Sequence, residues 1–558
     1  YYTPVNTVAV IFSTIGGRLF RSAAAAAAHS RHSSCTDSLL SPLAKMSKTQ
    51  AGGVSVEGVQ AERVRSLNEK DCVAGGHYVL YWMQASVRCD FNHALEFAIA
   101  RANALNKPLA CCFGLTDGYP EANERHYAFM LQGLAEVQSD LLRLRHINLD
   151  VFKGSPEAVV SELSNDACEV VTDMGYMRIQ RSWRTRLAER ALCNVWQIES
   201  DIVVPVETAS DKEEFAARTI RGKIQSVASK YLKPVECVEL EDMSIVDLQS
   251  RTAAPKLDLS DVDAALAGLD VDRSVPRVSS FIGGRSEAQR CLQQFIDTKL
   301  SKYGEGRDEP MDNSQSYLSA YLHFGQISPV EIILAVRAAK ASKTGKDNFI
   351  EQLMIRRELA INFCWYCPQY DSLECLHDWA KTTLAAHRDD KRDYVYDLAR
   401  LESGQTHDPY WNAIQLEMVV TGKMHGYFRM YWGKKVLEWT ADVDTAFKWL
   451  LYLNNKYELD GRDANGYTGV AWIFGKHDRA HAERAVYGKV RYMSQDGIKR
   501  KFKTLPAYVK HIEKLAADYK KTYGPIGAVK SGKAGPSATT TASSASSASE
   551  PPAKKKRK

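Results

Sequence analysis

Hydrophobic residues between positions 75 and 205 come in short continuous runs that alternate with amphipathic segments. The runs are HYVLYWMQ, PLACCFGL, DVFKG, EVVTDM and NVWQIESDIVV, at residues 77–84, 108–115, 150–154, 169–174 and 194–204. Each has the composition of a buried strand, and FNHALEFAIARANAL (91–105) has the spacing of an amphipathic helix between the first two. Strands that alternate with helices predict a parallel α/β domain over residues 75–205.

The pattern changes towards the C-terminal half of the chain. Residues 206–280 contain prolines and acidic turns, which are typical of a connector. From 281 to 522 the hydrophobic spacing is helical and strand-like runs vanish, which predicts an all-α domain. Seven of the ten tryptophans lie after residue 360, so unusual chemistry is expected in this half. The expected fold class is therefore a parallel α/β domain followed by an all-α domain.

The two ends of the chain differ in composition from the middle. Residues 1–70 are rich in Ser, Ala and Arg, and we expect them not to fold. Two interpretations stay open, a transit peptide for a chloroplast or mitochondrion and an extension ahead of a true start at Met46. Residues 523–558 predict a flexible tail rich in Gly, Ser, Ala and Thr. Its basic end, Lys554–Lys558, is of the kind that directs proteins to the nucleus.

The formal net charge of +6 comes from the ends of the chain. The last five residues carry +5 and residues 1–50 carry +4, so residues 51–553 are net acidic. A nucleic-acid surface would therefore be a local patch, such as 476–503, which has nine Lys and Arg against three acids. No run approaches the roughly 20 apolar residues that cross a bilayer, so no membrane contact is expected. The twelve cysteines lack metal-ligand spacing and predict buried thiols, so no metal site is expected.

The segment GKMHGYFRMYWGKKVLEWT (422–440) has no proline and predicts one long helix. Trp432 and Trp439 are seven residues apart, so the helix presents both indoles on one face. A third indole, Trp411, lies just upstream. Large aromatic residues at this spacing are usually core residues, and only their neighbours favour another role.

Those neighbours are polar. His425 and Arg429 lie within two turns of Trp432, and a buried guanidinium needs a carboxylate partner because unpaired buried charge is strongly unfavourable. Asp460 and Asp463 are the candidate partners. An Arg–Asp pair between aromatic walls would suit a planar, redox-active cofactor.

These residues carry a family resemblance. WNAIQLEMVVTGKMHGYFRMYWGKKVLEWT (411–440), LDGRDANGYTGVAW (459–472) and SYLSAYLHFGQIS (316–328) resemble class II cyclobutane pyrimidine dimer photolyases, within the wider photolyase and cryptochrome family. The resemblance extends from about residue 77 to 520. It implies FAD in the helical domain and an antenna chromophore, a deazaflavin or a folate, in the α/β domain. It also implies a monomeric carbon–carbon lyase that binds pyrimidine dimers in DNA, flips them out and splits them by electron transfer from light-excited reduced FAD.

The resemblance also implies roles for single residues. The positions that match flavin-binding residues are Tyr303, Ser316, Ser319, Arg429, Asn454 and Asp460. Within this set, Arg429 and Asp460 match the ion pair beside the flavin ring, and Asn454 matches the residue that faces flavin N5. The two serines lie near a helix start, where backbone amides suit a phosphate, although serines there are also ordinary N-caps.

Other matches concern DNA and electron transfer. In the lesion pocket of the family, the matching residues of this chain are Glu351, Met430 and Trp472. A DNA-contacting arginine of the family corresponds to Arg307. The electron-transfer triad, which relays electrons from the surface to oxidised flavin, matches Trp411, Trp432 and Trp439. The chain departs from the family at Arg356, where other photolyases have a tryptophan. The carboxylate assigned to Glu351 could therefore have become Gln352.

Two alternatives to a repair enzyme are a cryptochrome-like photosensor and a DNA-binding protein without catalysis. A photosensor that acts through a protein partner would be expected to have a long, specialised C-terminal extension, whereas this tail is short and of low complexity. If the protein only bound DNA, two features would have no explanation, namely the segment 316–328, which resembles the flavin loop of the family, and the Arg–Asp pair. The sequence therefore favours the enzyme.

Overall fold

The computed structural model describes residue 56 and residues 58–526. Within these residues the strands are β1 (Val64–Ser66), β2 (Tyr78–Trp82), β3 (Leu109–Leu115), β4 (Leu149–Lys153), β5 (Ala167–Asp173) and β6 (Asn194–Ile198). They form one sheet in the order β1-β6-β5-β2-β3-β4, in which β1 is antiparallel to β6 and the other pairs are parallel. The five predicted strands are confirmed, although β6 ends at Ile198, earlier than expected.

Strand β1 corrects the expectation that residues 1–70 do not fold. Val64–Ser66 pair with Trp196–Ile198 of β6. The preceding residue, Arg63, is buried and donates hydrogen bonds to three backbone carbonyls between residues 199 and 203. A strand of three residues is too short to show a periodic pattern, so sequence reasoning missed it. The transit-peptide and start-site hypotheses concern residues 1–70, of which residues 1–55, including Met46, lie outside the described part.

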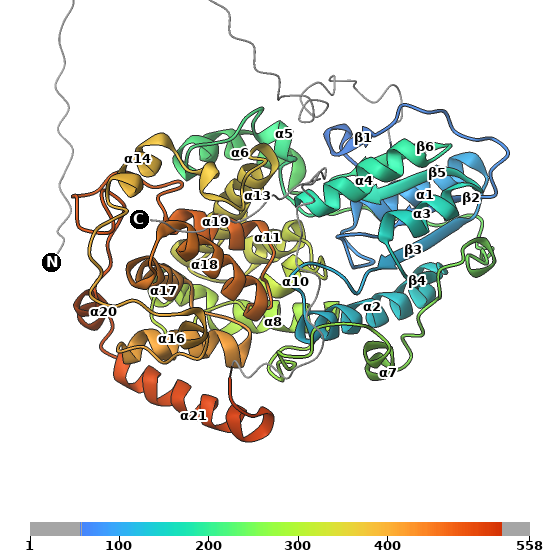
Figure 1. Cartoon of the computed structure of the whole chain (residues 1–558). Helices are drawn as coiled ribbons and strands as arrows, with labels where there is room; N and C mark the ends of the chain where they lie inside the picture. The colour runs from blue at the N-terminus through green and yellow to red at the C-terminus, as the bar shows by residue number, and fades with distance from the viewer. Residues whose placement is uncertain (1–55, 57, 527–558) are drawn as a thin grey trace, which may run out of the picture. The chain divides into compact units, whose positions relative to one another are not determined.

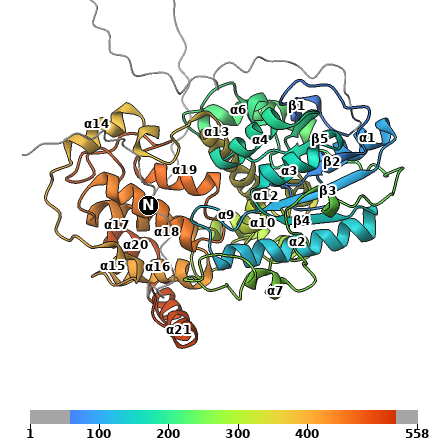
Figure 2. The same ribbon diagram turned by 45° about the vertical axis from the view of Figure 1, so that its right-hand side comes forward.

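Helices cover both faces of the sheet (Figures 1 and 2). They are α1 (His93–Leu105), α2 (Glu124–Arg145), α3 (Pro156–Ser164) and α4 (Arg178–Arg190). Val79 and Tyr81 of β2 belong to the core beneath α1 and α2, whereas Leu80 and Trp82 belong to the core beneath α3 and α4. A strand covered on both faces needs apolar residues at every position, which explains why β2 is a continuous hydrophobic run.

The remaining chain is helical, as predicted. Its helices are α5 (Val206–Ala209), α6 (Ala217–Tyr231), α7 (Val262–Ala267), α8 (Arg285–Thr298), α9 (Tyr303–Gly306), α10 (Ser319–His323), α11 (Pro329–Ala338), α12 (Lys343–Ile350), α13 (Arg357–Tyr366), α14 (Asp378–Ala386), α15 (Leu398–Glu402), α16 (Pro409–Thr421), α17 (Gly426–Trp439), α18 (Val443–Tyr457), α19 (Ala464–Ile473), α20 (Gln495–Lys501) and α21 (Leu505–Tyr523). A π-helical turn, Glu351–Arg356, joins α12 to α13. Ile220 and Ile224 of α6 are buried with residues of the helical part, so the segment 206–280 is not merely a connector. The exact domain boundaries stay predictions.

The N-terminus of α2 fastens the α/β part to the helical part. Arg125 Nη1 and Nη2 donate to the backbone carbonyls of Tyr457 and Val419, at 2.6 and 2.8 Å. His126 Nε2 lies 3.0 Å from the carbonyl oxygen of Glu458. These bonds hold the segment after α18 in place, and that segment carries the acids of the candidate site.

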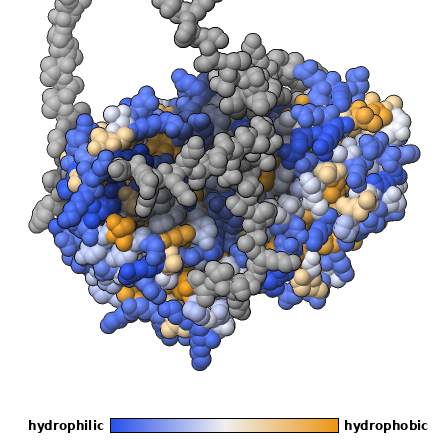
Figure 3. All heavy atoms as spheres, in the orientation of Figure 1, coloured by the Kyte–Doolittle hydropathy of each residue, from blue (hydrophilic) through white to orange (hydrophobic). Residues whose placement is uncertain are grey.

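The visible surface is largely hydrophilic. On the face shown in Figure 3, hydrophobic residues form small separate patches between hydrophilic ones. Among the described residues, no helix is both long enough and apolar enough to cross a bilayer. The basic run Lys554–Lys558 and most of the predicted flexible tail lie outside these residues.

Candidate active site

One arginine of helix α17 faces two carboxylates, the buried Glu458 and the half-buried Asp460. Arg429 Nη2 lies 3.0 Å from Glu458 Oε2 and 3.2 Å from Asp460 Oδ1. Burial by itself lowers the pKa of Arg429, but the two carboxylates outweigh burial and raise the pKa above its ordinary value. The contact expected between Arg429 and Asp460 is present, and Glu458 is a second partner that sequence reasoning missed. The run Y-E-L-D was the available signal, because it places both acids next to the end of α18.

Helix α10 closes the site on the Asp460 side. Burial acts to raise the pKa of Asp460, but the charge of Arg429 and a hydrogen bond with the Ser319 hydroxyl outweigh it and lower the pKa. His323, on the same helix, is half-buried, and its partial removal from water lowers its pKa to about 4. The imidazole of His323 is therefore neutral at physiological pH, and Asp460 is ionised.

Asn454 lies on α18, one turn before the acids. Its side chain is almost fully buried, and Nδ2 donates to Asn455 Oδ1 at 3.0 Å. Gly466 of α19 packs against it, since a Cβ at that position would lie only 2.8 Å from Asn454 Nδ2. The glycine therefore leaves room for the amide, which can donate or accept a hydrogen bond.

The other two predicted flavin-binding residues have different environments. Tyr303 is buried, and its ring contacts Phe295 and Phe349 at centroid distances of 5.5 and 5.3 Å. Burial raises the pKa of the Tyr303 hydroxyl, so it stays protonated. Ser316 is half-buried in the loop that precedes α10, where Ser319 is the first helical residue. Only Ser319 has a contact with the Arg429 cluster among the interactions of the described residues.

The three predicted relay tryptophans lie together in the core of the helical part. Trp411 Nε1 donates to the backbone carbonyl of Trp432 at 3.0 Å. The ring of Trp411 meets that of Trp439 at 5.7 Å between centroids and an angle of 68°. Trp432 and Trp439 are each 3% exposed, and Trp411 is 0% exposed. Trp411 therefore contacts both tryptophans of α17, an arrangement that the sequence spacing alone did not provide.

An aromatic group that sequence reasoning missed continues outward from Trp439. The Trp439 ring contacts His407 at 4.9 Å and Tyr396 at 5.8 Å. His407 stacks on Tyr394 at 3.7 Å, and Tyr394 is 47% exposed. Aromatic rings thus connect Trp439 with the surface. The pair of tyrosines in Y-V-Y (394–396) was a signal, but its distance in sequence from α17 concealed the contact.

The predicted lesion-pocket residues are only partly brought together. Met430 is half-buried beside Arg429, and Trp472 is half-buried on α19, with Arg356 Cζ 6.0 Å from its ring centroid. Glu351 instead faces α6, where Arg221 holds it with two bonds of 2.6 and 3.1 Å. Its link to Trp472 runs through Arg356, whose Nε lies 3.4 Å from Glu351 Oε1. The carboxylate of Glu351 is thus already paired, which weighs against a lesion contact.

Arg307 and His425 lie on the other side of the cluster. Arg307 follows α9, is about one-third exposed and forms an ion pair with Asp308 at 3.4 Å. His425 is buried, and Gln315 Nε2 lies 3.4 Å from its Nε2. Burial lowers the pKa of His425, so its imidazole is neutral.

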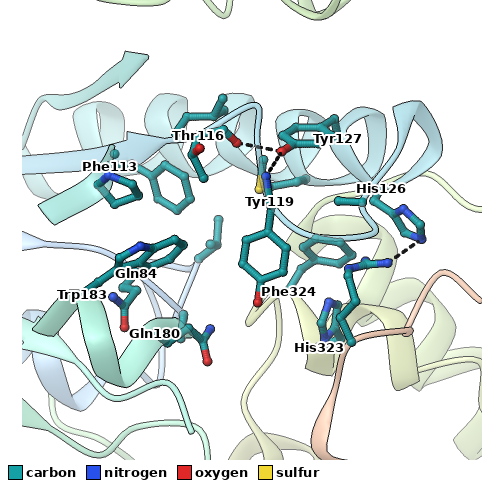
Figure 4. A pocket seen from close by; sticks show the side chains of 18 of the residues that line it. Gln84, Phe113, Thr116, Tyr119, His126, Tyr127, Gln180, Trp183, His323 and Phe324 are labelled. Carbon is teal, nitrogen blue, oxygen red and sulfur yellow. Dashed lines mark hydrogen bonds between the residues drawn. The ribbon is translucent and has the colours of Figure 1, made fainter. Parts of the chain in front are cut away.

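A separate cavity lies at the carboxyl ends of strands β2 and β3 (Figure 4). It has about 820 Å³ of empty space, part of it open to solvent. Trp183 of α4 and Phe113 of β3 provide aromatic walls, and Tyr119 meets Trp183 edge-on at 6.0 Å. His323 and Arg462 form the wall towards the helical part. This is the position at which open α/β sheets usually bind ligands, and it agrees with the antenna site expected in this domain.

Comparisons with known proteins identify the family. Residues 79–239 match a family model described as DNA photolyase. The chain is 48% identical over 458 residues to a deoxyribodipyrimidine photo-lyase of Methanothermobacter thermautotrophicus, and the match covers 82% of this chain and 99% of that protein. It is 38% identical over 455 residues to a protein of the same name from Arabidopsis thaliana, covering 79% and 90%. The chain belongs to the photolyase family.

Solved photolyase and cryptochrome structures share the fold. An archaeal photolyase from Sulfolobus tokodaii, whose structure contains two FAD molecules, matches with a TM-score of 0.59 and 18% identity, covering 79% of this chain and 93% of that one. A Synechocystis cryptochrome matches with a TM-score of 0.60 and 15% identity, covering 80% and 94%. The photolyase fold, with its α/β and helical parts, is therefore confirmed for this chain.

The residues of the Arg429 site fit the flavin that the photolyase family implies. Several buried polar atoms near it have no hydrogen-bond partner among the described residues, namely both carboxylate oxygens of Glu458 and His425 Nδ1. Buried polar groups are normally satisfied, so unpaired groups gathered around one site indicate a missing ligand. Arg429, Ser319 and Asn454 add donors that suit the carbonyl, phosphate and ring-nitrogen acceptors of FAD.

Proposed function

We propose that this protein is a light-dependent DNA repair enzyme, a deoxyribodipyrimidine photo-lyase that splits pyrimidine dimers. The observation that carries the proposal is the Arg429–Asp460 pair set beside a chain of three buried indoles. The pair suits a flavin, and the indoles suit single-electron transfer. The photo-lyase relatives, which match this chain over most of their length, provide independent support.

The cofactor and the protein have separate tasks. When bound, reduced FAD absorbs light and supplies the electron that opens the dimer. Arg429, Asp460 and Asn454 would orient its ring, and Ser316, Ser319 and Tyr303 would hold the rest of the molecule. The side chains of Arg429 and Asp460 are 29% and 14% exposed, so their ion pair is partly shielded from water, which strengthens its charge-assisted hydrogen bonds.

The lesion is expected beside the half-buried indole of Trp472. A pyrimidine dimer is flipped out of the duplex, as photolyases are known to do, and stacks on this ring. Met430 would act as an apolar wedge, and Arg307 would contact the DNA backbone. Glu351 keeps a smaller role in this proposal because Arg221 and Arg356 already pair with it.

The finer assignment to class II rests on the motif of residues 411–440 and on the three indoles that it places together. For Trp411, Trp432 and Trp439 we propose the role of a relay that reduces oxidised flavin in the light. The path that we propose leads from Trp439 through Trp411 to Trp432, and it is supported by the ring contact of Trp411 with Trp439 and by the hydrogen bond from Trp411 Nε1 to the backbone carbonyl of Trp432.

For the cavity of Figure 4 we propose an antenna chromophore, a deazaflavin or a folate. Its walls are flat aromatic rings, and Gln84, Gln180 and Arg462 provide a few polar groups. This combination of apolar walls and few polar groups is typical of pockets for planar ligands.

The cellular location and the oligomeric state are further proposals. Lys554–Lys558 support entry into the nucleus, and residues 1–70 support a chloroplast or mitochondrion only if they form a transit peptide. We also propose that the enzyme acts as a monomer.

One experiment separates the repair enzyme from the cryptochrome-like photosensor. The purified protein is expected to show the absorption bands of a flavin and to repair a dimer-containing oligonucleotide under blue light, with no repair in the dark. A flavin spectrum without repair would favour the photosensor. If the protein showed no flavin spectrum and no repair, both proposals would be contradicted.

A further inference from the structure

The carboxylate of Glu458 is buried without the hydrogen bonds that such a group normally has. The side chain is 1% exposed, and neither oxygen accepts a hydrogen bond from the described residues. Among the described residues, Glu458 forms its ion pair with Arg429, at 3.0 Å, and Asp460 shares the same guanidinium nitrogen at 3.2 Å. An ionised carboxylate in such a place is unfavourable, because burial removes water and nothing replaces its hydrogen bonds.

Glu458 and Asp460 share the charge of Arg429, whereas a third acid of the cluster has a cation of its own. The third carboxylate of the cluster, Glu417 on α16, accepts from Lys423 Nζ at 2.9 Å and from the Tyr508 hydroxyl at 2.8 Å. Lys423 therefore neutralises Glu417, and Arg429 is left with two acids. Of two acids that share one guanidinium, the acid that is more deeply buried and has fewer hydrogen bonds binds a proton more readily.

Glu458 is the acid that binds this proton. Asp460 receives donors from Arg429 and Ser319, whereas Glu458 receives no hydrogen bond. Burial raises the pKa of Glu458 to about 8; Arg429 opposes this effect, and the charges of Asp460 and Glu417 add to it. On the α2 side, Arg125 uses its guanidinium on backbone carbonyls, and burial keeps His126 neutral. Arg125 keeps its positive charge and attracts the Glu458 carboxylate, but among the described residues its hydrogen bonds go to backbone carbonyls and none goes to Glu458.

We propose that Glu458 holds a proton in the folded protein, and that this proton lets the Arg429 site accept an anionic ligand. The first statement concerns this chain alone, and the second rests on the proposed function. Reduced flavin is anionic, and a neutral Glu458 leaves the charge of Arg429 divided between Asp460 and the ligand. An ionised Glu458 would add a second negative charge on Arg429 and repel the ligand.

The first test compares Glu458→Gln with wild type in urea unfolding between pH 5 and pH 9. The unfolded carboxyl loses its proton near its ordinary pKa of 4.5, while the folded one keeps it to about 8. Raising the pH through this window therefore destabilises the wild type. The Glu458→Gln variant is not destabilised in this way, because glutamine has no proton to lose. We expect similar stability at pH 5 and a growing advantage of the variant towards pH 9. A variant that is less stable at pH 7 and recovers in acid would overturn the proposal, since it would show an ionised Glu458 paired with Arg429.

Glu402→Gln provides the matched control. Glu402 is also buried, but it accepts from Lys456 Nζ at 2.8 Å and from the Tyr457 hydroxyl at 2.7 Å, so its charge is paired. Its loss should destabilise the protein with no advantage that grows at alkaline pH. Infrared difference spectra at pH 6 give a second readout, because the carboxylic C=O band should be lost in Glu458→Gln. An unchanged band region would contradict the proposal.

The second statement is tested by binding of FAD that has been reduced without oxygen. Wild-type affinity should fall about fivefold between pH 8 and pH 9, because the protonated fraction of a group with a pKa of about 8 falls from about one half to about one eleventh, while the affinity of Glu458→Gln stays constant. Equal pH profiles in the two proteins would overturn this part and leave the photolyase function standing. A wild type that binds no FAD at any pH would instead overturn the proposed function, and the unfolding test would still decide the protonation of Glu458.

Discussion

At the scale of single residues, Trp472 combines a partly open ring with an indole N–H that has no partner among the described residues. Such a ring is suited to stack on a base that has left the duplex. The neighbouring guanidinium of Arg356 lies beside the indole, with its Cζ 6.0 Å from the ring centroid. The energetic role of Trp472 can therefore be measured separately from that of the surrounding charges.

We predict that Trp472→Ala weakens binding of dimer-containing DNA by about 1–3 kcal/mol, the value of a lost base–aromatic stack. Affinity for undamaged duplex of the same length should change little, because that DNA has no flipped base. Fluorescence anisotropy with the two duplexes measures both. An equal loss for both duplexes would show that Trp472 is not part of the lesion pocket.

At the scale of elements, the α16–α17 pair decides which indoles meet. The seven-residue spacing on α17 places Trp432 and Trp439 on one face, and α16 inserts Trp411 against both. The repair reaction needs only reduced flavin, whereas the relay is needed when the flavin is oxidised. The two functions of this element pair are thus separable.

We predict that Trp411→Phe and Trp439→Phe keep the fold and FAD, because Phe retains most of the buried apolar area. Photoreduction from the oxidised state should slow at least tenfold in each, measured by flavin absorbance under blue light. With chemically reduced flavin, repair should stay close to wild type. Trp449→Phe is the control, since Trp449 lies on α18 in the same core outside the chain of three indoles. Normal photoreduction in the Trp439→Phe variant would show that Trp439 is not part of the relay.

At the scale of the whole molecule, the α2 N-terminus connects the sheet to the segment that carries Glu458 and Asp460. Arg125 is 1% exposed and donates to three backbone carbonyls, those of Pro276, Tyr457 and Val419. Carbonyls left unpaired in the interior are destabilising. The position of the acids thus depends on a residue outside the helical part.

We predict that Arg125→Ala lowers the unfolding free energy by about 2–5 kcal/mol, from several unpaired buried carbonyls. FAD affinity should fall as well, because the segment after α18 loses its support. Urea unfolding and FAD titration measure the two effects. Arg143→Ala on the exposed side of the same helix should change stability by less than about 0.5 kcal/mol. A similar small effect in Arg125→Ala would show that the clamp is dispensable.

A second prediction at this scale concerns DNA. The affinity for DNA should fall steeply as the salt concentration rises, because neutralisation of phosphates dominates such binding. Since residues 51–553 are net acidic, the DNA must bind to a local basic patch. Charge reversal of the exposed Lys499 and Arg500 on α20 should reduce affinity for damaged and undamaged duplex alike and flatten the salt dependence. An unchanged salt slope would place the DNA surface elsewhere.

The sequence by itself determined the features that depend on local spacing. Continuous apolar runs identified β2 to β6, because a strand covered on both faces is apolar at every position. Helical spacing placed Trp432 and Trp439 on one face, and the need to neutralise a buried guanidinium predicted a partner for Arg429 among nearby acids. Each inference needs only a few neighbouring residues.

Tertiary structure decided everything that depends on residues far apart in the chain. It selected Asp460 and added Glu458, brought Trp411 against the Trp439 ring and the Trp432 backbone, and paired Glu351 with Arg221 of α6. It also folded Val64–Ser66 into the sheet, although so short a segment has no readable pattern. The physical reason is the same in each case. Burial, charge pairing and ring contact are properties of neighbours in space, and spacing along the chain constrains those neighbours only within one element.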